Sequence, residues 1–351
     1  MRTLEASLAP DPSELGEAIG NRVNERGMPT REIRDELRTI DDRRNALTVA
    51  GALAQSYGVV GAAAVANTWW AYSGAFVFMA RGHVCLNILA HEAAHRLLFN
   101  DRNTNDKVGR WLLGYPTLQP MLRYRRAHFA HHRDELGPDE PDLALYAGYP
   151  VPGDSWRRKL WRDLRGNSAK KNIGALVFLA RSGDTEARQV LGIQAGMALL
   201  ALLARRPLAW LVWIGSWSTL WKVSNRLRSI AEHGGMVRSR DRRQTTHVIK
   251  QDRLSRFWIA PYHTGLHLAH HADMGVPWRN LPRLHAELVE AGWVTDDLEH
   301  RSYLAFWRKA SSGPARSSTG GIDADPVPSA EAGTRVDAQV PPSGVTPNLD
   351  M

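Results

Sequence analysis

Residues 45–80 contain no Asp, Glu, Lys or Arg, and this gap in charge restricts the fold more than any other feature of the 351-residue chain. One transmembrane helix needs about 20 apolar residues. The gap therefore predicts a helical hairpin in a membrane, with spans at about 46–66 and 69–90; a long buried helix of a soluble protein is the alternative. The expected turn carries Trp69 and Trp70, and tryptophan is typical of the membrane interface.

A second apolar pair lies at 189–204 and 207–221, and it is split by Arg205, Arg206 and Pro207. Each half is short for a full span, so these helices would have to be tilted. Together, the two pairs predict an all-α membrane protein with about four transmembrane helices in two hairpins.

The flanking sequence divides the chain into three parts. Residues 1–44 are polar and predict an N-terminal extension without the apolar core of a signal peptide. Residues 45–308 predict the membrane domain. Residues 309–351 are rich in Ser, Gly, Pro and Asp and predict a disordered tail.

The chain carries a net charge of +9, and its Lys and Arg residues flank the apolar segments. This pattern favours a cytoplasmic membrane face and anionic head groups over nucleic acid as a partner. We therefore predict a multi-pass membrane protein with both termini on the cytoplasmic side. Arg81 falls well inside the second predicted span, and a charge at such a position is a functional hint by default.

The 14 histidines are strongly clustered. On a helix, positions i, i+3 and i+4 share one face, so an HxxHH pattern directs three imidazoles to one point. By composition, only about 0.02 such matches are expected by chance, and the chain has two. Neutral imidazole suits iron, copper or zinc. The candidate ligands are His91, His95, His128, His131, His132, His233, His267, His270 and His271, with His263 as a candidate tenth.

The order of clusters and spans predicts one shared site. The first two clusters follow the first hairpin and the last two follow the second, so all would lie on the same, cytoplasmic side of the membrane. Nine or ten ligands exceed what one metal binds, whereas two metals with four or five ligands each would fit. A pair of irons with open positions can bind O2. The single cysteine, Cys85, excludes a disulfide framework and a cysteine-ligated cluster.

The HEAAH motif at 91–95 also matches HExxH, the zinc peptidase signature, in which Glu92 would be the general base. A membrane zinc peptidase is therefore a competing hypothesis, although it leaves both HxxHH clusters unexplained. Without that role, Glu92 is a hydrogen-bond partner of a histidine or an ordinary helix residue. Asp139, Glu140 and Asp142 follow the second cluster and are candidates to orient histidine N–H groups.

The set of motifs resembles the membrane fatty acid desaturase family, whose three histidine boxes read HEAAH at 91–95, HFAHH at 128–132 and HLAHH at 267–271 in this chain. The Arg228–His233 element resembles the additional ligand histidine of that family. The run from Leu281 to His285 resembles the sequence that follows the third box.

The resemblance implies four transmembrane helices below a cytoplasmic helical cap that holds two irons. It implies an O2-dependent desaturase of lipid acyl chains, with electrons supplied by a separate ferredoxin, rubredoxin or cytochrome. A lipid or carotenoid hydroxylase or ketolase of the same superfamily is the alternative, because such enzymes use the same boxes.

Overall fold

The computed structural model describes residues 7–314, which are mostly helical. Within this part of the chain there is one two-stranded parallel sheet, in which β1 (Val248–Ile249) pairs with β2 (Glu299–His300). The predicted all-α class is confirmed.

The first predicted hairpin is formed by α2 (Asp42–Ala66) and α3 (Trp69–His95). The Asp41 side chain caps the start of α2 by accepting a hydrogen bond from the Arg44 N–H, and Asn67 ends the helix in a left-handed conformation with φ 49°. Both helices are long and apolar enough to cross a membrane. Helix α3 continues past the predicted end of its span, and its last turns carry the HEAAH motif.

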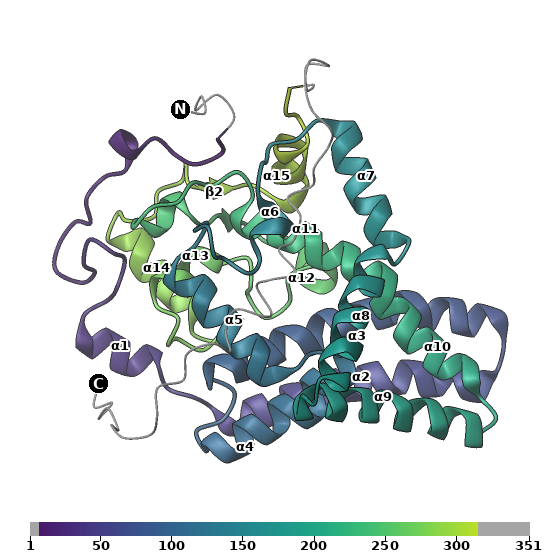
Figure 1. Ribbon diagram of the computed structural model, residues 1–351. Coiled ribbons are helices and arrows are strands. Elements are labelled where there is room, and N and C mark those ends of the chain that lie inside the picture. The colour runs from purple at the N-terminus through teal and green to yellow at the C-terminus, as the bar shows by residue number, and fades with distance from the viewer. Residues whose placement is uncertain (1–6, 315–351) are drawn as a thin grey trace. The chain divides into compact units, whose positions relative to one another are not determined.

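The second apolar pair forms α9 (Thr185–Leu203) and α10 (Pro207–Ser216). Without a break, α10 continues through the π-helical turn η4 (Trp217–Trp221) into α11 (Lys222–His233). Figure 1 shows α9 and α10 running beside α2 and α3. Of the helices in residues 7–314, α2 and α3 alone meet the length and hydropathy expected of a span, so the expectation of four spans stays a prediction.

Helix α3 is the central element, because α2 and α10 pack on it and the histidine-bearing helices cover its C-terminal half. Its side chains Met79, Leu86 and Leu89 are fully buried in the largest apolar cluster. Trp213 also lies in this cluster, and its indole N–H donates to the Pro116 carbonyl at 2.8 Å. The two tryptophans of η4, Trp217 and Trp221, are also buried against α3.

The remaining elements are shorter than α2, α3 and α9. They are η1 (Pro12–Glu14), α1 (Arg31–Leu37), α4 (Arg102–Lys107), the π-helical η2 (Val108–Gly114), η3 (Tyr115–Thr117), α5 (Met121–Arg133), α6 (Leu143–Tyr146), α7 (Gly153–Leu164), α8 (Asn167–Arg181), η5 (Arg242–Gln244), α12 (Arg253–Trp258), α13 (His267–Ala272), α14 (Leu281–Glu290) and α15 (Tyr303–Ala310).

The N-terminal segment is packed against the histidine-bearing part of the chain. Val23 and Leu37 are buried in an apolar cluster with residues of α13 and α14. Arg34 and Arg38 form ion pairs of 3.2 and 2.6 Å with Asp273, which directly follows α13 and whose side chain is 1% exposed. The polar composition of this segment did not predict the packing, because only a few of its residues make the buried contacts.

Replacing Asp273 with Ala is expected to lower the thermal unfolding temperature of the metal-loaded protein. The change leaves two guanidinium groups without their shared carboxylate, and breaking a buried ion pair costs about 3 kcal/mol, less here because both arginines are partly exposed. The matched control is Asp35→Ala, because Asp35 forms an exposed ion pair with Arg31. Equal unfolding temperatures for both variants would contradict a structural role of the Asp273 contacts.

Several basic residues that favoured a cytoplasmic lipid-facing surface are paired inside the protein. Arg226 is buried and pairs with Asp163, Arg123 pairs with Asp184, and Arg125 pairs with Asp106. The count of positive charges therefore overstates the charge available to a membrane.

At the C-terminal end, α15 packs on α11 and the Gly313 N–H donates to the Val151 carbonyl at 3.1 Å. The ordered fold thus extends past the predicted boundary at 308. The rest of the predicted tail, residues 315–351, lies outside the described residues.

Candidate metal centre

Four helices bring nine of the ten predicted histidines together. His91 and His95 lie in the last two turns of α3, and three histidines lie on the buried face of α5. His233 ends α11, and the last three lie in α13. Arg125 fixes α5 against the end of α3, because its guanidinium donates to the carbonyls of Ala93 and Ala94 at 2.9 and 2.8 Å.

The first group of ligand nitrogens consists of His91, His95, His128 and His270. Their Nε2 atoms face one another: His95 and His128 are 2.8 Å apart, and His91 and His270 are 3.2 Å apart. His132 joins this group, since its Nε2 lies 3.0 Å from that of His128 and 3.2 Å from that of His270. The group therefore offers five nitrogens.

The second group consists of His131, His233, His267 and His271. The Nε2 of His267 lies 3.1 Å from that of His233 and 3.0 Å from that of His271. The two groups are adjacent, because the rings of His132 and His271 have centroids 4.3 Å apart. Together the two groups bring nine imidazoles into positions that could hold metal.

The Nε2 spacings are compatible with binding of a metal by both groups. Two imidazole nitrogens bound at right angles to one metal, each about 2.1 Å from it, are about 3.0 Å apart. Hydrogen bonds between the rings do not explain the second group equally well. Nδ1 of His233 donates to the Thr245 carbonyl at 2.8 Å and Nδ1 of His271 donates to Glu135 at 2.5 Å, so in the neutral rings both Nε2 atoms are lone pairs. In its neutral form, Nε2 of His267 carries at most one N–H, which can point directly at only one of these two lone pairs. A metal ion between the three rings could bind all three nitrogens.

Burial keeps most of these rings in the form that binds a metal. Desolvation, followed by the neighbouring histidines, holds the pKa of His128, His132 and His271 well below its usual range. Burial also lowers the pKa of His270 to about 3. These imidazoles are therefore neutral at pH 7 and their lone pairs are available.

Carboxylates accept hydrogen bonds from the Nδ1 atoms of two histidines in the second group. Glu140 accepts a hydrogen bond from Nδ1 of His131 at 2.5 Å, and this contact raises the pKa of His131 against the opposing effect of burial. Of the three acidic residues singled out in the sequence, Glu140 is buried against a histidine, whereas Asp139 is exposed and Asp142 is half-buried.

Glu135 is the most connected residue that the sequence analysis missed. It is 2% exposed and contacts Nδ1 of His271, the Arg242 guanidinium and the Thr245 hydroxyl. With His132 and His271 it also forms a third set of candidate ligands. Its position three residues after the second box was the one sequence feature that could have pointed to it. Two of its partners, Arg242 and Thr245, lie more than a hundred residues away in the sequence.

Replacing Glu140 with Gln is expected to weaken metal binding by about 10- to 100-fold, because the partner that orients a ligand imidazole loses its charge. Titration of the metal-depleted protein with Fe²⁺ or Co²⁺ measures this change. Asp139→Asn is the matched control, since it removes the same charge one residue away at an exposed position. Equal affinities for the two variants would show that Glu140 does not support the site.

Two residues singled out in the sequence lie outside the groups. His263 is half-buried and its ring stacks on Trp278 with centroids 6.2 Å apart, so its role as a tenth ligand stays a prediction. Glu92 is buried, and its Oε2 accepts from the Trp278 backbone N–H at 3.3 Å. It belongs to no candidate metal group within residues 7–314, and this position does not favour a peptidase base.

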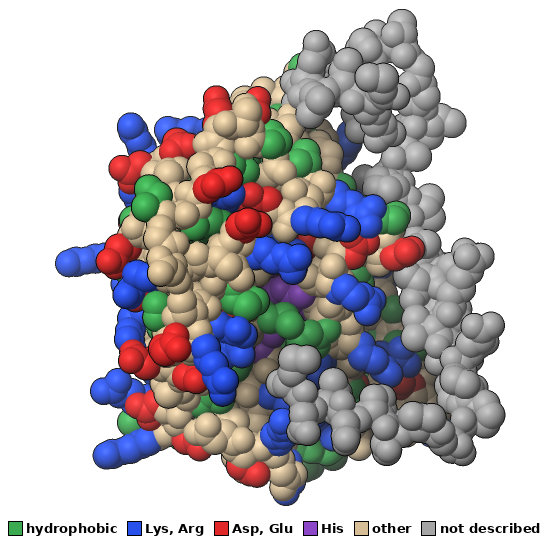
Figure 2. All heavy atoms as spheres, turned by 90° about the vertical axis from the view of Figure 1, so that its left-hand side faces the viewer, with side chains coloured by type: hydrophobic (Ala, Val, Ile, Leu, Met, Phe, Trp, Pro, Cys, Tyr) green, Lys and Arg blue, Asp and Glu red, His purple; other side chains and the backbone are tan. Residues whose placement is uncertain are grey.

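One face of the molecule exposes histidine side chains. Figure 2 shows histidine side chains in the middle of that face, with hydrophobic side chains beside them and Lys and Arg around them. His91 and His95 are half-buried, whereas the other seven histidines of the two groups are buried. The arrangement thus leaves a restricted approach to the first group.

The fold and site together define a helical protein with an apolar hairpin and a histidine-lined centre able to hold metal. Residues 67–303, more than half of the chain, match the model of the fatty acid desaturase family. The chain belongs to that family, as its three boxes indicated. It is 27% identical over 252 residues to a dihydrorhizobitoxine desaturase of Bradyrhizobium elkanii, an alignment that covers 64% of this chain and 71% of that protein.

Proposed function

We propose that this protein is an O2-dependent desaturase that introduces a double bond into a lipid acyl chain at a histidine-ligated pair of irons. The observation that carries the proposal is the convergence of nine imidazoles into adjacent groups of five and four. Family membership and the related desaturase support the reaction type.

The proposed ligands of one iron are His91, His95, His128, His132 and His270, and those of the other are His131, His233, His267 and His271. When bound, the irons would supply the redox chemistry for O2 to oxidise a C–H bond. In the overall reaction, two hydrogens leave adjacent methylenes, O2 accepts them together with two electrons and two protons, and two waters form. The electrons would come from a separate ferredoxin, rubredoxin or cytochrome.

The protein's own groups prepare the site for this reaction. Glu135 and Glu140 fix the tautomers of His271 and His131, so that their Nε2 lone pairs point inward. Burial keeps the other imidazoles neutral and excludes bulk water. His91 and His95 are half-buried and leave an approach to the first group, and the Lys and Arg side chains on the face drawn in Figure 2 suit an acidic electron carrier.

The proposal places the enzyme in a membrane as a multi-pass protein, with the metal centre and both termini on the cytoplasmic side. The hairpin α2–α3 supports membrane insertion by its length and hydropathy. Reporter fusions at the two ends test this arrangement: the same cytoplasmic readout at both ends is expected, and opposite readouts would contradict it.

The reaction is tested by expressing the chain in a host of defined fatty acid profile together with an electron donor. A product two hydrogens lighter than its substrate, and dependent on O2, supports the proposal. A product one oxygen heavier would identify a hydroxylase instead.

A further inference from the structure

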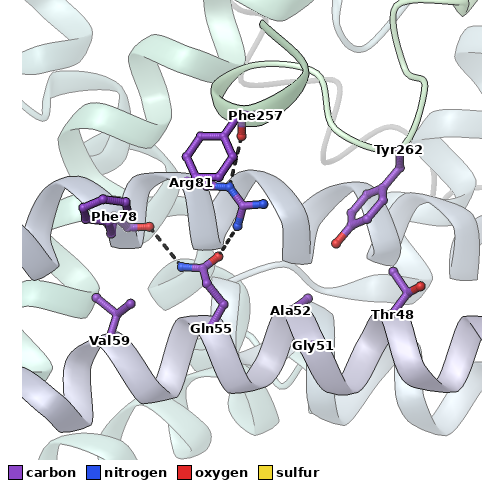
Figure 3. A pocket seen from close by; sticks show the side chains of 9 residues that line it. All are labelled: Thr48, Gly51, Ala52, Gln55, Val59, Phe78, Arg81, Phe257 and Tyr262. Carbon is purple, nitrogen blue, oxygen red and sulfur yellow. Dashed lines mark hydrogen bonds between the residues drawn. The ribbon is translucent and has the colours of Figure 1, made fainter. Parts of the chain in front are cut away.

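A cavity of about 570 Å³ lies between α2, α3 and the segment 257–262 that includes the end of α12. Figure 3 shows its side chains: Arg81 points from α3 toward Gln55 on α2 and toward Phe257, and Tyr262 stands farther along the same space. This cavity is separate from the histidine groups, and its size falls in the range of small-ligand sites.

Arg81 is held by neutral partners. Its Nε–H donates to the Phe257 carbonyl at 3.1 Å and its Nη1 donates to Gln55 Oε1 at 2.6 Å. The guanidinium also lies 4.2 Å from the centroid of the Phe257 ring. A guanidinium has five N–H donors, and these hydrogen bonds use two of them. No carboxylate among residues 7–314 forms an ion pair with Arg81.

A cation in this position needs a counter-charge. Arg81 lies in a helix apolar enough to cross a membrane, and a charge in such a setting is destabilised unless it is paired. Carbonyl, amide and ring contacts spread the positive charge without cancelling it. At the other end of the cavity the Thr48 hydroxyl is already engaged with Arg44 and Arg279, and Arg81 is the one cationic residue among those that line the cavity.

The cavity leads along α3 toward the metal centre. His91 is ten residues beyond Arg81 on this helix, which corresponds to about 15 Å. Tyr262 lines the cavity and its ring lies 5.0 Å from that of Trp278, whose backbone N–H donates to Glu92 beside His91.

The segment that contributes Tyr262 to the cavity carries backbone strain. Tyr262 and His263 have φ values of 58° and 60°, a left-handed conformation that non-glycine residues rarely adopt and that clusters at functional sites.

We propose that Arg81 binds the carboxylate of an amphiphilic substrate acid, whose chain extends along α3 toward the histidine groups. This inference rests on the proposed function for the role of the ligand as substrate. A carboxylate fits because it carries one charge for one unpaired guanidinium and accepts two N–H bonds in its plane. A dianionic phosphate would exceed the charge that Arg81 supplies.

The test is ligand binding to the iron-loaded full chain in detergent, without O2 or reductant, so that turnover plays no part. The probes are dodecanoic acid, its methyl ester and dodecyl phosphate, which share one chain. The wild-type protein is expected to bind the acid at least about tenfold more tightly than the ester, as a charge-assisted hydrogen bond predicts. Equal binding of acid and ester, or tighter binding of the phosphate, would overturn the proposal.

Two variants test whether Arg81 causes the preference for the acid over the ester. Arg81→Gln is expected to lose the discrimination between acid and ester, and Arg81→Lys is expected to keep part of it. The matched control Arg256→Gln removes the same charge from an exposed residue beside Phe257 and should keep the full preference. Iron content and thermal unfolding confirm that each variant is folded.

The inference and the proposed function can fail separately. An acid preference that survives in Arg81→Gln would overturn the inference, even if the protein desaturates. Conversely, an Arg81-dependent acid preference in a protein without desaturase turnover would uphold the carboxylate site and contradict the proposed reaction.

Discussion

Replacing His95 or His267 with Ala is expected to abolish turnover and to remove one of the two metals from each chain. His95 belongs to the first group and His267 to the second, so each change removes a nitrogen from a different coordination shell. Loss of a residue that hydrogen-bonds a metal ligand weakens metal binding or activity by about 10- to 100-fold. Loss of a ligand itself should therefore reduce activity by more than about a hundredfold. Elemental analysis after expression with added iron, together with turnover, measures both effects.

The control for these variants is His285→Gln, because the His285 ring contacts Glu299 and lies outside both groups. It should keep both metals and full activity. His263→Ala belongs in the same experiment: loss of a metal would make His263 a tenth ligand, and retention of both would exclude it. Full iron content in His95→Ala or His267→Ala would contradict the assignment of the groups.

The contrast between Glu92→Gln and His91→Ala is the second large expected effect. His91→Ala should eliminate activity, because it removes a proposed ligand. Glu92→Gln should retain measurable activity, since the Glu92 carboxylate contacts the Trp278 backbone N–H and lies outside the candidate metal groups. In a zinc peptidase, the same glutamate would be the general base, and its replacement would be as damaging as loss of a ligand.

Iron content and turnover are measured on both variants under the conditions used for the wild-type protein. Complete loss of activity in Glu92→Gln, with iron retained, would contradict the prediction that the Glu92 carboxylate is not required for activity. One tightly bound zinc and no iron, found together with that loss, would favour the peptidase.

The histidine boxes could be predicted because helix periodicity alone places i, i+3 and i+4 on one face. The long α2–α3 hairpin was predictable for a similar reason, since the absence of charge is a local property of the chain. Glu140 was one of three acidic candidates, with Asp139 and Asp142, that were singled out because they follow the second box. Each of these predictions used only residues that lie close together in the sequence.

The missed features depend on contacts between distant segments. Glu135 is fixed by Arg242 and Thr245, which follow α11. The N-terminal segment looked like a polar extension, yet Arg34 and Arg38 hold Asp273 after α13. Such pairings are decided by tertiary packing, which no periodicity in the sequence reports.

The second apolar pair carries polar residues and an irregular turn. In α9, Glu186 and Arg188 fall inside the helix, and α10 passes after ten residues into the π-helical turn η4. Glu186 is buried and accepts from backbone N–H groups at the start of α5. Polar contacts of this kind shorten the apolar length that hydropathy assigns to a helix.

The central claim is that the nine imidazoles hold two irons that serve lipid desaturation. Mass spectrometry of the acyl chains in a host that expresses the protein with an electron donor tests it most directly, with His131→Ala as the inactive control. The account predicts an O2-dependent product two hydrogens lighter than its substrate, absent in the control and produced by protein with about two irons per chain. An unchanged acyl profile with a competent donor present, or an equal product from His131→Ala, would contradict it.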